Sequence, residues 1–353
     1  MRFFPFSAGS WSRDIAVDLG TVNTVVCAEG GELVVAEPSI VAVDARTGAA
    51  LAAGSAALEL LTEDGIVAIR PLKDGSIVDL HGAAELLRCL IGNVQPHSRR
   101  QPRVVASVSG ALSAVQRRAV LEACRLAGGR EGRLIATPIA AALGSGLPVA
   151  EPTGSMVLDL GGGRCEVAVM SLGAVVASRS IPVGSCDFDQ RIVAHLKRRH
   201  AILVAEHTAE QIKVHIGSAS THAKDAQIEI LARDMASETL KRVRLTGQQI
   251  HGTLESPITR IIQATKDTLA CTPPQLASDV MDRGILLSGG GSLLHGLAEQ
   301  LGRQTGTPAR VADRPFTSTA IGLTRALDKQ PRAPDRLHAP GVAVTSCRFD
   351  LAS

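Results

Sequence analysis

The sequence lacks the patterns that mark several large classes of protein. It contains no run of about 18 apolar residues, so no transmembrane helix is expected. Its seven cysteines form no Cys-x-x-Cys motif, which argues against a zinc site or a disulfide framework and favours a reduced, cytoplasmic compartment. The formal net charge is only +3, which is too small to indicate a nucleic-acid partner.

Aromatic residues are scarce and unevenly placed. Tyrosine is absent, and four of the seven aromatic residues lie within the first eleven positions: Phe3, Phe4, Phe6 and Trp11. Arginines flank this arm, as in segments that anchor a protein at a membrane interface. The alternative is a hydrophobic arm packed on its own domain. A signal peptide would need a longer apolar core, and Pro5 argues against a regular helix.

The composition is that of a globular protein, with 45% hydrophobic and 20% charged residues. The chain is long enough for two domains with separate cores. Residues 155–170 form an apolar run that ends at Asp159, then three glycines and a second apolar run. We predict two antiparallel strands joined by a glycine turn whose backbone amides can bind phosphate oxygens.

The same pattern occurs 141 residues earlier, where residues 14–27 place Asp18 at the position of Asp159. A third apolar strand with a glycine turn, residues 284–294, is expected to open into a helix. Two equivalent hairpins predict an internal duplication, with a nucleotide held between the halves.

Five segments in this order resemble the MreB family of bacterial actins. They are residues 18–24, 73–78, 159–163, 210–219 and 288–291, and the resemblance covers about residues 14–328. It implies an α/β, actin-like ATPase fold, in which duplicated ribonuclease H-like domains flank a nucleotide cleft and each carries a smaller outer subdomain.

The resemblance also divides the chain into parts. After a hydrophobic arm at residues 1–13, it implies domain I at residues 14–150 plus 319–328, with its outer subdomain at about 33–77, and domain II at 151–318, with its outer subdomain at about 182–251. Residues 329–353 hold three prolines and little periodicity, so we expect a flexible tail.

The ligands implied by the resemblance are ATP and Mg²⁺. Asp18 and Asp159 would hold the metal through waters, because Mg²⁺ dehydrates reluctantly. The implied nucleotide-binding residues are Gly20, Thr21, Val22, Asn23, Gly161, Gly162, Gly163, Glu210, Gln211, Ile212, Lys213, Gly289, Gly290, Gly291 and Ser292. Glu210 and Lys213 would border the ribose and base, although spacing alone favours an ordinary surface lysine at position 213.

Two positions depart from the family pattern. The family places a water-orienting glutamate before a proline, whereas here Thr137 precedes Pro138. Threonine is not a base at neutral pH, and loss of a general base costs about 10²–10⁴-fold in rate. Cys165 replaces a usual threonine and follows the bulky Arg164, so both are expected at the γ-phosphate site, where Arg164 would either add charge stabilisation or point to solvent. We predict normal nucleotide binding but slow hydrolysis, with Thr137 and Glu166 as the candidate catalytic residues.

Periodicity predicts several helices. One covers residues 80–91, and a second covers 112–127 with Leu112, Val115, Ala119, Ala123 and Leu126 facing inward. Others are expected at 188–200, from a capping box at Thr208, at 250–269 and at 293–303, with a chain break at Pro273 and Pro274.

The resemblance implies a polymer-forming, ATP-binding bacterial actin that is peripheral to the inner face of the cell membrane and helps organise cell-wall synthesis and shape. Its partners would be copies of itself, other MreB-type subunits and membrane proteins of cell-wall elongation. A basic loop at residues 95–103, including Arg99, Arg100 and Arg103, is either a lipid contact or merely solvated.

Other functions remain open at this point. A weak hydrolase would suit a scaffold or a regulator of a copolymer. A small-molecule kinase of the same superfamily would need a catalytic aspartate for a substrate hydroxyl, and no obvious one occurs. An Hsp70-type chaperone would need a long substrate-binding domain after residue 330, where only a short segment follows. The sequence does not distinguish ATP from GTP.

Overall fold

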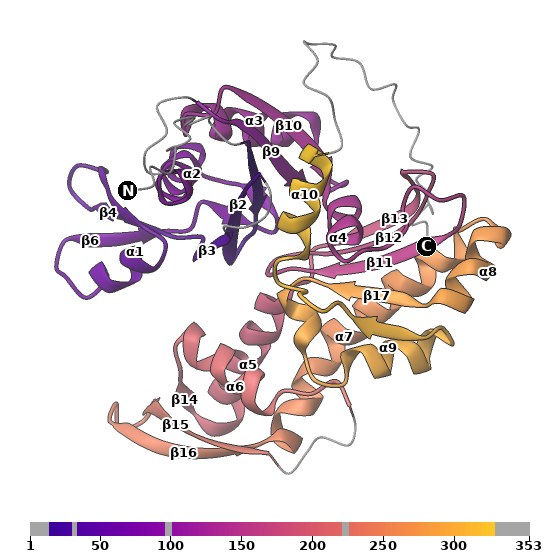
Figure 1. Ribbon diagram of the computed structural model, residues 1–353. Helices are drawn as coiled ribbons and strands as arrows, with labels where there is room; N and C mark the ends of the chain where they lie inside the picture. Colours follow the sequence, from indigo (N-terminus) through magenta and orange to yellow (C-terminus); the bar gives the residue numbers. More distant parts are fainter. Residues whose placement is uncertain (1–13, 30–33, 96–100, 221–225, 329–353) are drawn as a thin grey trace, which may run out of the picture. The chain divides into compact units, whose positions relative to one another are not determined.

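The computed structural model describes residues 14–29, 34–95, 101–220 and 226–328 (Figure 1). The described chain forms two compact units. The first contains residues 14–108, 112–135 and 323–328, and the second contains 109–111 and 136–322. The change of unit at 135/136 lies before the boundary at 150/151 that the family resemblance implies.

The first unit is built on a five-stranded sheet with the order β10-β9-β1-β2-β3. Its strands are β1 (Ile15–Leu19), β2 (Asn23–Ala28), β3 (Val34–Pro38), β9 (Arg103–Val108) and β10 (Glu131–Ala136). The pairs β1–β2 and β2–β3 are antiparallel, and β9 lies parallel to β1 on its other side. The predicted hairpin at residues 14–27 is therefore present.

Helix α2 (Leu80–Val94) begins at Asp79, whose side chain accepts a hydrogen bond from the amide of Gly82 at 2.9 Å. The apolar face predicted for this helix is buried in the core of the first unit, as the exposed fractions of its four residues show: Leu86 0%, Leu87 0%, Leu90 1% and Ile91 9%. The helix prediction is confirmed, and the helix continues three residues further to Val94.

Helix α3 (Ala114–Leu126) corrects part of a prediction. Val115 was expected to face inward but is 79% exposed. The side chains that α3 and its C-cap bury are Val120, Ala123, Cys124 and Ala127. Their spacing of three and four residues defines one helical face, and Val115 lies off that face. The capping box of Ser113 and Gln116 sets the start of the helix.

The outer part of the first unit is a three-stranded sheet with the order β5-β4-β6. Its elements are β4 (Val41–Asp44), β5 (Ala50–Ala53), α1 (Ser55–Leu60) and β6 (Ile66–Ile69), and β7 (Leu72–Lys73) and β8 (Ser76–Ile77) follow as a two-stranded pair. A small cluster of Ile40, Ala42 and Ala57 holds α1 on this sheet.

The second unit repeats the plan of the first with the sheet order β13-β12-β11-β17-β18. Its strands are β11 (Ser155–Leu160), β12 (Cys165–Ser171), β13 (Ala174–Ile181), β17 (Ile285–Ser288) and β18 (Ala309–Val311). Here too, the first two strand pairs, β11–β12 and β12–β13, are antiparallel, and a later strand, β17, lies parallel to the first. This shared topology supports the predicted duplication.

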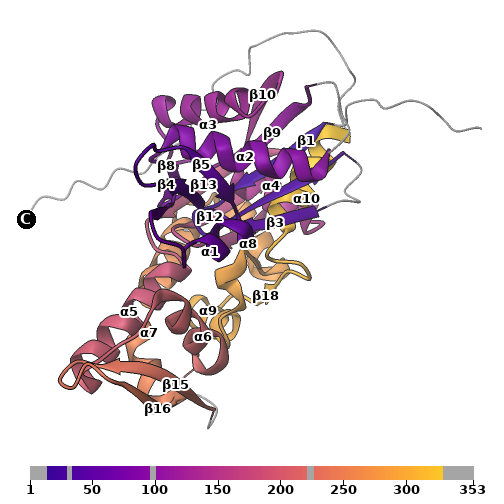
Figure 2. The same ribbon diagram turned by 90° about the vertical axis from the view of Figure 1, so that its left-hand side faces the viewer.

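Helices cover both faces of this sheet (Figures 1 and 2). The helices that follow the first unit's sheet along the chain are α4 (Thr137–Gly144), α5 (Ser185–His200), α6 (Glu206–Ile216), α7 (Gly247–Ala270), α8 (Pro274–Arg283) and α9 (Leu297–Thr305), together with the 3₁₀ helix η1 (Gly290–Leu293). The last helix, α10 (Ser318–Asp328), begins in the second unit and continues into the first. Leu158 and Leu160 share a core with residues of α5, α6 and α7, whereas Val157 packs with Ala141 and Ala142 of α4. The alternation follows from the two-residue period of a strand.

Several helix predictions can now be judged. The helix at 188–200 is confirmed, since Phe188, Ile192 and Leu196 are fully buried in α5. The capping box at Thr208 is wrong, because α6 already begins at Glu206.

Two predictions near the third glycine turn also need correction. The helix expected at 293–303 is a 3₁₀ turn followed by α9. The supposed break at Pro273 and Pro274 is instead the start of α8, because proline suits the first helical position, where its missing amide costs nothing.

The outer part of the second unit is a three-stranded sheet with the order β14-β15-β16. It consists of β14 (Ile202–Leu203), β15 (Gln227–Asp234) and β16 (Leu240–Thr246). Ile230, Ala232 and Leu245 bury one face of the sheet in the core that also holds residues of α5 and α6. The other face is exposed.

Helices α4 and α10 cross with their backbones in contact. A Cβ atom on Gly144 would lie 1.8 Å from the carbonyl oxygen of Ser318, and a Cβ atom on Gly322 would lie 1.8 Å from that of Ala140. Only glycine allows this approach at either position, because real Cβ contacts are never so short.

The aromatic arm with Phe3, Phe4, Phe6 and Trp11, the tail at 329–353, and Arg99 and Arg100 lie outside the described residues. Arg103 is described, and its guanidinium forms an ion pair with Asp14, so this arginine joins the starts of the neighbouring strands β9 and β1. No helix in the part of the chain that the structure describes is long and apolar enough to cross a bilayer.

Candidate functional site

The second hairpin, β11 and β12, ends in the predicted glycine turn. Leu160 pairs with Cys165, and the amide of Gly161 donates to the carbonyl of Arg164 at 2.9 Å. The carbonyls of Gly161 and Gly162 each accept a hydrogen bond of 2.9 Å from an amide in the first turn of α5, those of Ser185 and Cys186. The start of α5 therefore fixes the conformation of the turn.

Glycine backbones from two other segments pack against this hairpin. A Cβ atom on Gly184 would lie 2.2 Å from the carbonyl oxygen of Gly162, and one on Gly289 would lie 2.3 Å from that of Leu160. A Cβ atom on Gly291 would lie 2.6 Å from the Cγ atom of Leu160. The structure thus brings the turn at 161–163 and the loop at 289–291 together at the end of β11, as a backbone cradle without side chains.

The hairpin also carries two acidic residues on one face. Asp159 and Glu166 are directly opposite each other across the strands. They lie on the same face as Val157 and Ala168, which pack against α4. The buried Glu166 carboxylate accepts hydrogen bonds at Oε1 from the Ser109 hydroxyl at 2.8 Å and the Gly110 amide at 3.0 Å. Glu166 therefore holds the segment 109–111 against the hairpin.

The two unusual residues after the glycines behave differently from each other. Cys165 is fully buried in the core beside Val167, on the opposite face from Asp159, so the prediction that it lines a phosphate site is wrong. Burial raises the pKa of the Cys165 thiol well above its ordinary value, and the nearby carboxylates of Asp159 and Glu166 add to the shift. Arg164 donates a hydrogen bond of 3.1 Å to the Ser180 hydroxyl on β13.

Thr137 is the first residue of α4, directly before Pro138. The helix packs through Ala141 and Ala142 on the face of the sheet that carries Asp159 and Glu166. The position that the family pattern gives to a water-orienting carboxylate therefore belongs to the helix that covers this face.

The first hairpin, β1 and β2, has a turn with a single glycine. A Cβ atom on Gly20 would lie 2.4 Å from the carbonyl oxygen of Asn23. The buried Ser39 side chain donates to the Gly20 carbonyl at 2.6 Å, and its amide donates to the carbonyl of Val22 at 2.7 Å. The amide of Gly75 donates to the Thr21 hydroxyl at 2.9 Å, which brings the motif at 73–78 to this turn.

Asp18 lies one residue before the end of β1 and is half-buried. The Ser107 hydroxyl on the neighbouring strand β9 donates to its carboxylate at 2.6 Å. Burial raises the pKa of Asp18 above its ordinary value, and the hydrogen bond from Ser107 opposes the shift only in part. A carboxylate in this environment is stabilised in its charged form by a nearby cation.

The predicted nucleotide-binding residues on α6, Glu210 to Lys213, lie in two different environments. Glu210 and Gln211 are exposed, while the side chain of Ile212 is fully buried in the core. Lys213 is no ordinary surface lysine, because its ammonium forms a 2.9 Å ion pair with Asp189 of α5 and both side chains are largely buried. Burial raises the pKa of Asp189 to about 6 although Lys213 opposes the shift.

The third glycine loop is fixed by its own polar groups. The amide of Gly289 donates to the carbonyl of Pro315 at 2.9 Å, and the buried Ser292 hydroxyl donates to the Gly289 carbonyl at 2.6 Å. Gly289 has a φ of 79°, a left-handed conformation that favours glycine. Gly290 is exposed at this loop.

Three residues that the sequence did not single out support the site: Gly184, Ser107 and Asp189. A glycine just before an amphipathic helix is a recognisable N-cap signal, so Gly184 was within reach. Ser107 and Asp189 act across strands and helices that only the fold brings together.

Among the described residues, no three or more His, Cys, Asp or Glu side chains gather as metal ligands. A single carboxylate beside a phosphate-type turn is a different kind of ligand. It suits Mg²⁺, which keeps several waters and uses one or two carboxylates together with phosphate oxygens. Asp18 and Asp159, each beside a phosphate-type turn, provide oxygen ligands of that kind.

Comparisons with known proteins agree with this geometry. Residues 12–334 match a family model described as MreB/Mbl protein. The chain is 42% identical over 328 residues to the cell shape-determining protein MreB of Escherichia coli strain K12, covering 91% of this chain and 94% of that protein.

Two solved structures resemble the chain closely. MreB5 of Spiroplasma citri bound to ADP has a TM-score of 0.83 and 27% identity, and covers 91% of this chain and 100% of that chain. The same protein bound to AMPPNP has a TM-score of 0.83 and 28% identity, and covers 90% and 96% of the two chains.

Proposed function

The chain belongs to the MreB/Mbl family and has its actin-like fold, and from this membership we propose how the protein works. It is a bacterial actin homologue that binds ATP, assembles with copies of itself and helps to determine cell shape. The family assignment made from five motifs is confirmed, and it favours this function over that of a small-molecule kinase.

The backbone cradle in the second unit is the observation that carries nucleotide binding. Gly184, Gly289 and Gly291 leave no space for a Cβ atom, and they fix a turn of three glycines whose amides suit phosphate oxygens. Two related structures contain ADP and AMPPNP, which supports an adenine nucleotide as the ligand. We assign Lys213 a positioning role, because its ion pair with Asp189 joins α6 to α5.

Mg²⁺ would accompany the nucleotide, with Asp18 and Asp159 as its carboxylates through waters. When bound, the ion would neutralise phosphate charge. The residues of this chain bind and orient: Ser107 holds the Asp18 carboxylate, and Glu166 holds the segment 109–111 beside the second hairpin.

The binding proposal is tested by calorimetry with Asp159→Ala. We expect the affinity for ATP to lose its dependence on Mg²⁺, while the variant unfolds in urea as the natural protein does. An unchanged affinity for Mg-ATP would remove Asp159 from the site.

A scaffold or copolymer subunit with slow hydrolysis is the second candidate, and Thr137 favours it. Threonine supplies no carboxylate at the start of α4, while the glycine turns proposed to bind phosphate are present. Glu166 is a weak candidate for a substitute base, because its Oε1 atom already accepts two hydrogen bonds from Ser109 and Gly110.

We also propose that the filament lies at the inner face of the cell membrane, with the aromatic arm as one contact. The concentration of Phe3, Phe4, Phe6 and Trp11 in eleven residues motivates this proposal. Deletion of residues 2–11 should reduce flotation of the protein with liposomes. Equal flotation of both forms would leave the arm as a packing element.

A further inference from the structure

The outer part of the first unit carries an exposed patch that is acidic and apolar. This acidic patch consists of Leu58, Glu59, Leu61, Glu63 and Asp64, on α1 and the turn after it. All five residues are exposed, with Leu58 at 45% and Leu61 at 37%. No lysine or arginine occurs between residues 50 and 69, so the three carboxylates dominate the local potential.

The outer part of the second unit carries an exposed patch of the opposite sign. The pairing of β15 with β16 places Leu231 opposite Arg242 and Arg233 opposite Leu240, with Glu229 opposite Arg244. The basic patch consists of Leu231, Arg233, Leu240, Arg242 and Arg244, all exposed on the face that α6 does not cover. Leu231 is 58% exposed and Leu240 is 66% exposed.

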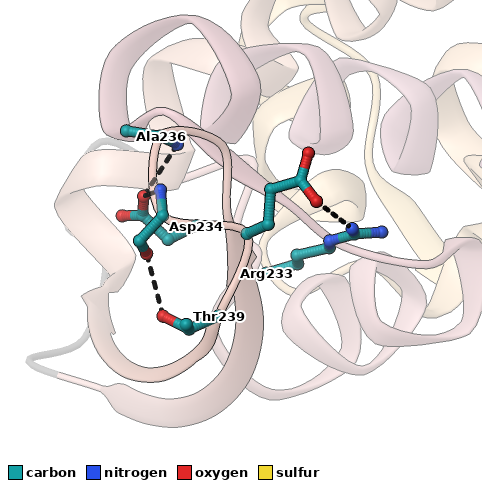
Figure 3. Close-up of polar contacts among 6 residues, drawn as sticks. Arg233, Asp234, Ala236 and Thr239 are labelled. Carbon is teal, nitrogen blue, oxygen red and sulfur yellow. Dashed lines mark hydrogen bonds and ion pairs between the residues drawn. The ribbon is translucent and has the colours of Figure 1, made fainter.

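Several polar contacts hold the turn between these two strands (Figure 3). The Asp234 carboxylate accepts hydrogen bonds from the amides of Ala236 at 2.8 Å and Ser237 at 3.0 Å, and it also pairs with Lys241. These bonds, led by that from Lys241, hold the pKa of Asp234 well below its ordinary value. Arg233 pairs with Glu238 at 3.0 Å. The basic patch is therefore presented on a preorganised surface, which lowers the entropy cost of docking.

The arginines are available for another partner even though two of them are paired. Arg242 contacts Glu229 at 2.7 Å, but the two side chains are 80% and 55% exposed, and exposed ion pairs of this kind add little to stability. Replacing the Glu229 carboxylate beside Arg242 with a carboxylate from another molecule therefore requires little free energy.

We propose that the acidic patch of one copy docks on the basic patch of a second copy, as a lateral contact between subunits. Each patch offers two exposed leucines and three charges, and the charges are of opposite sign. Within the part of the chain that the structure describes, all four leucines stay at least 37% exposed, which suits a contact with a second copy. The contact is small and draws its strength from repetition along a filament, and it thus rests on the proposed self-assembly.

Charge reversal with mixing tests this contact. One variant is Glu59→Arg with Glu63→Arg, the other is Arg242→Glu with Arg244→Glu, and the control is Arg260→Glu with Arg303→Glu, which changes the net charge as the second variant does. We expect each patch variant alone to lose about tenfold in lateral pairing of filaments in electron micrographs, while an equimolar mixture regains it. The rescue also shows that both variants are folded.

A second measurement does not depend on polymerisation. Without nucleotide and at low salt, the Glu59→Arg, Glu63→Arg variant immobilised on a sensor should bind the Arg242→Glu, Arg244→Glu variant at least tenfold more tightly than either binds itself. Added salt should weaken that binding, because the charges are exposed.

The outcomes separate the two proposals. If the natural chain forms no filament with Mg-ATP, the self-assembly proposal fails, and the sensor experiment still decides whether the patches bind. Equal pairing in all variants, an equal loss in the control, or rescue only when both reversals are in one chain would overturn the docking proposal.

Discussion

The two glycine hairpins share their strand pairing but differ in how their turns are held. The first turn contains one glycine and is fixed by the side chains of Ser39 and Thr21. The second contains three glycines and is fixed by backbone packing, with Gly184 and Gly289 in contact with it. Where hydroxyl groups hold the turn, each lost hydrogen bond should lower the stability of the fold by a small amount. Where the backbones are in close contact, a single added methyl group should cause a large loss of stability.

The largest expected effect tests the packed turn. Gly184→Ala places a Cβ atom 2.2 Å from the Gly162 carbonyl, so the start of α5 or the turn must move. We expect a loss of about 3 kcal/mol or more in the free energy of unfolding, measured by urea denaturation. Gly252→Ala in α7 is the matched control, because its Cβ atom would meet open space and the helix should gain up to about 1 kcal/mol. Equal stability of the two variants would contradict the packing argument.

The next effect concerns the helix that covers the second hairpin. Thr137→Glu restores a carboxylate before Pro138, where the start of the α4 helix tolerates a negative charge. Phosphate release from ATP should rise by about 10²-fold, with nucleotide affinity unchanged. Thr137→Gln has the same shape without the charge and should stay slow. No gain in the Glu variant would shift attention to Arg164.

A smaller effect concerns the pH dependence of the ion pair between α5 and α6. The folded pKa of Asp189, about 6, lies above its ordinary value of 3.8, so the folded protein binds this proton more tightly than the unfolded chain. The group therefore stabilises the fold at low pH, and this contribution is lost as the pH rises from 4 through 6. Between pH 4 and 7 the unfolding free energy should fall by about 2 kcal/mol relative to Asp189→Asn.

Urea denaturation at both pH values measures this change. Parallel pH profiles for the natural chain and the variant would show that Asp189 does not titrate in this range.

The smallest effect tests the turn held by side chains. Ser39→Ala removes the buried hydroxyl that forms hydrogen bonds with the Gly20 carbonyl and the Thr24 hydroxyl. The free energy of unfolding should fall by about 1–2 kcal/mol, with only a modest loss of nucleotide affinity. Ser237→Ala, at the exposed turn after β15, should cost less than about 0.5 kcal/mol and serves as the control. If Ser39→Ala destabilises the protein as much as Gly184→Ala, the contrast between the hairpins is lost.

Much of the fold was predictable because its signals are local. The Asp-x-Gly hairpins, the apolar face of α2 and the buried stripe of α5 follow from periods of two and 3.6 residues. Val115 was misplaced because the face that α3 buries depends on its neighbour α2. The start of α8 was missed because Pro273-Pro274 was taken as a break only, although proline also starts helices.

The site was predictable in its backbone and less so in its side chains. A glycine turn can be recognised from its own residues. The position of Cys165 depends instead on which face of β12 is buried in the core, and the residues beside the turn do not show this. The partners of Lys213 and Glu166 lie 24 and 57 residues away along the chain, at positions that only tertiary structure defines.

The crossing of α4 and α10 has a consequence for biosynthesis. Gly144 packs against α10, which lies about 170 residues further along the chain. When α10 is synthesised, nearly all of the described chain has already left the ribosome. The first unit also needs residues from 323 onward, so it cannot be completed before the second unit has been synthesised. Contacts of such long sequence separation form late and slowly. A nascent chain halted before Ser318 should therefore remain sensitive to proteases in both units, whereas one released after Asp328 should not.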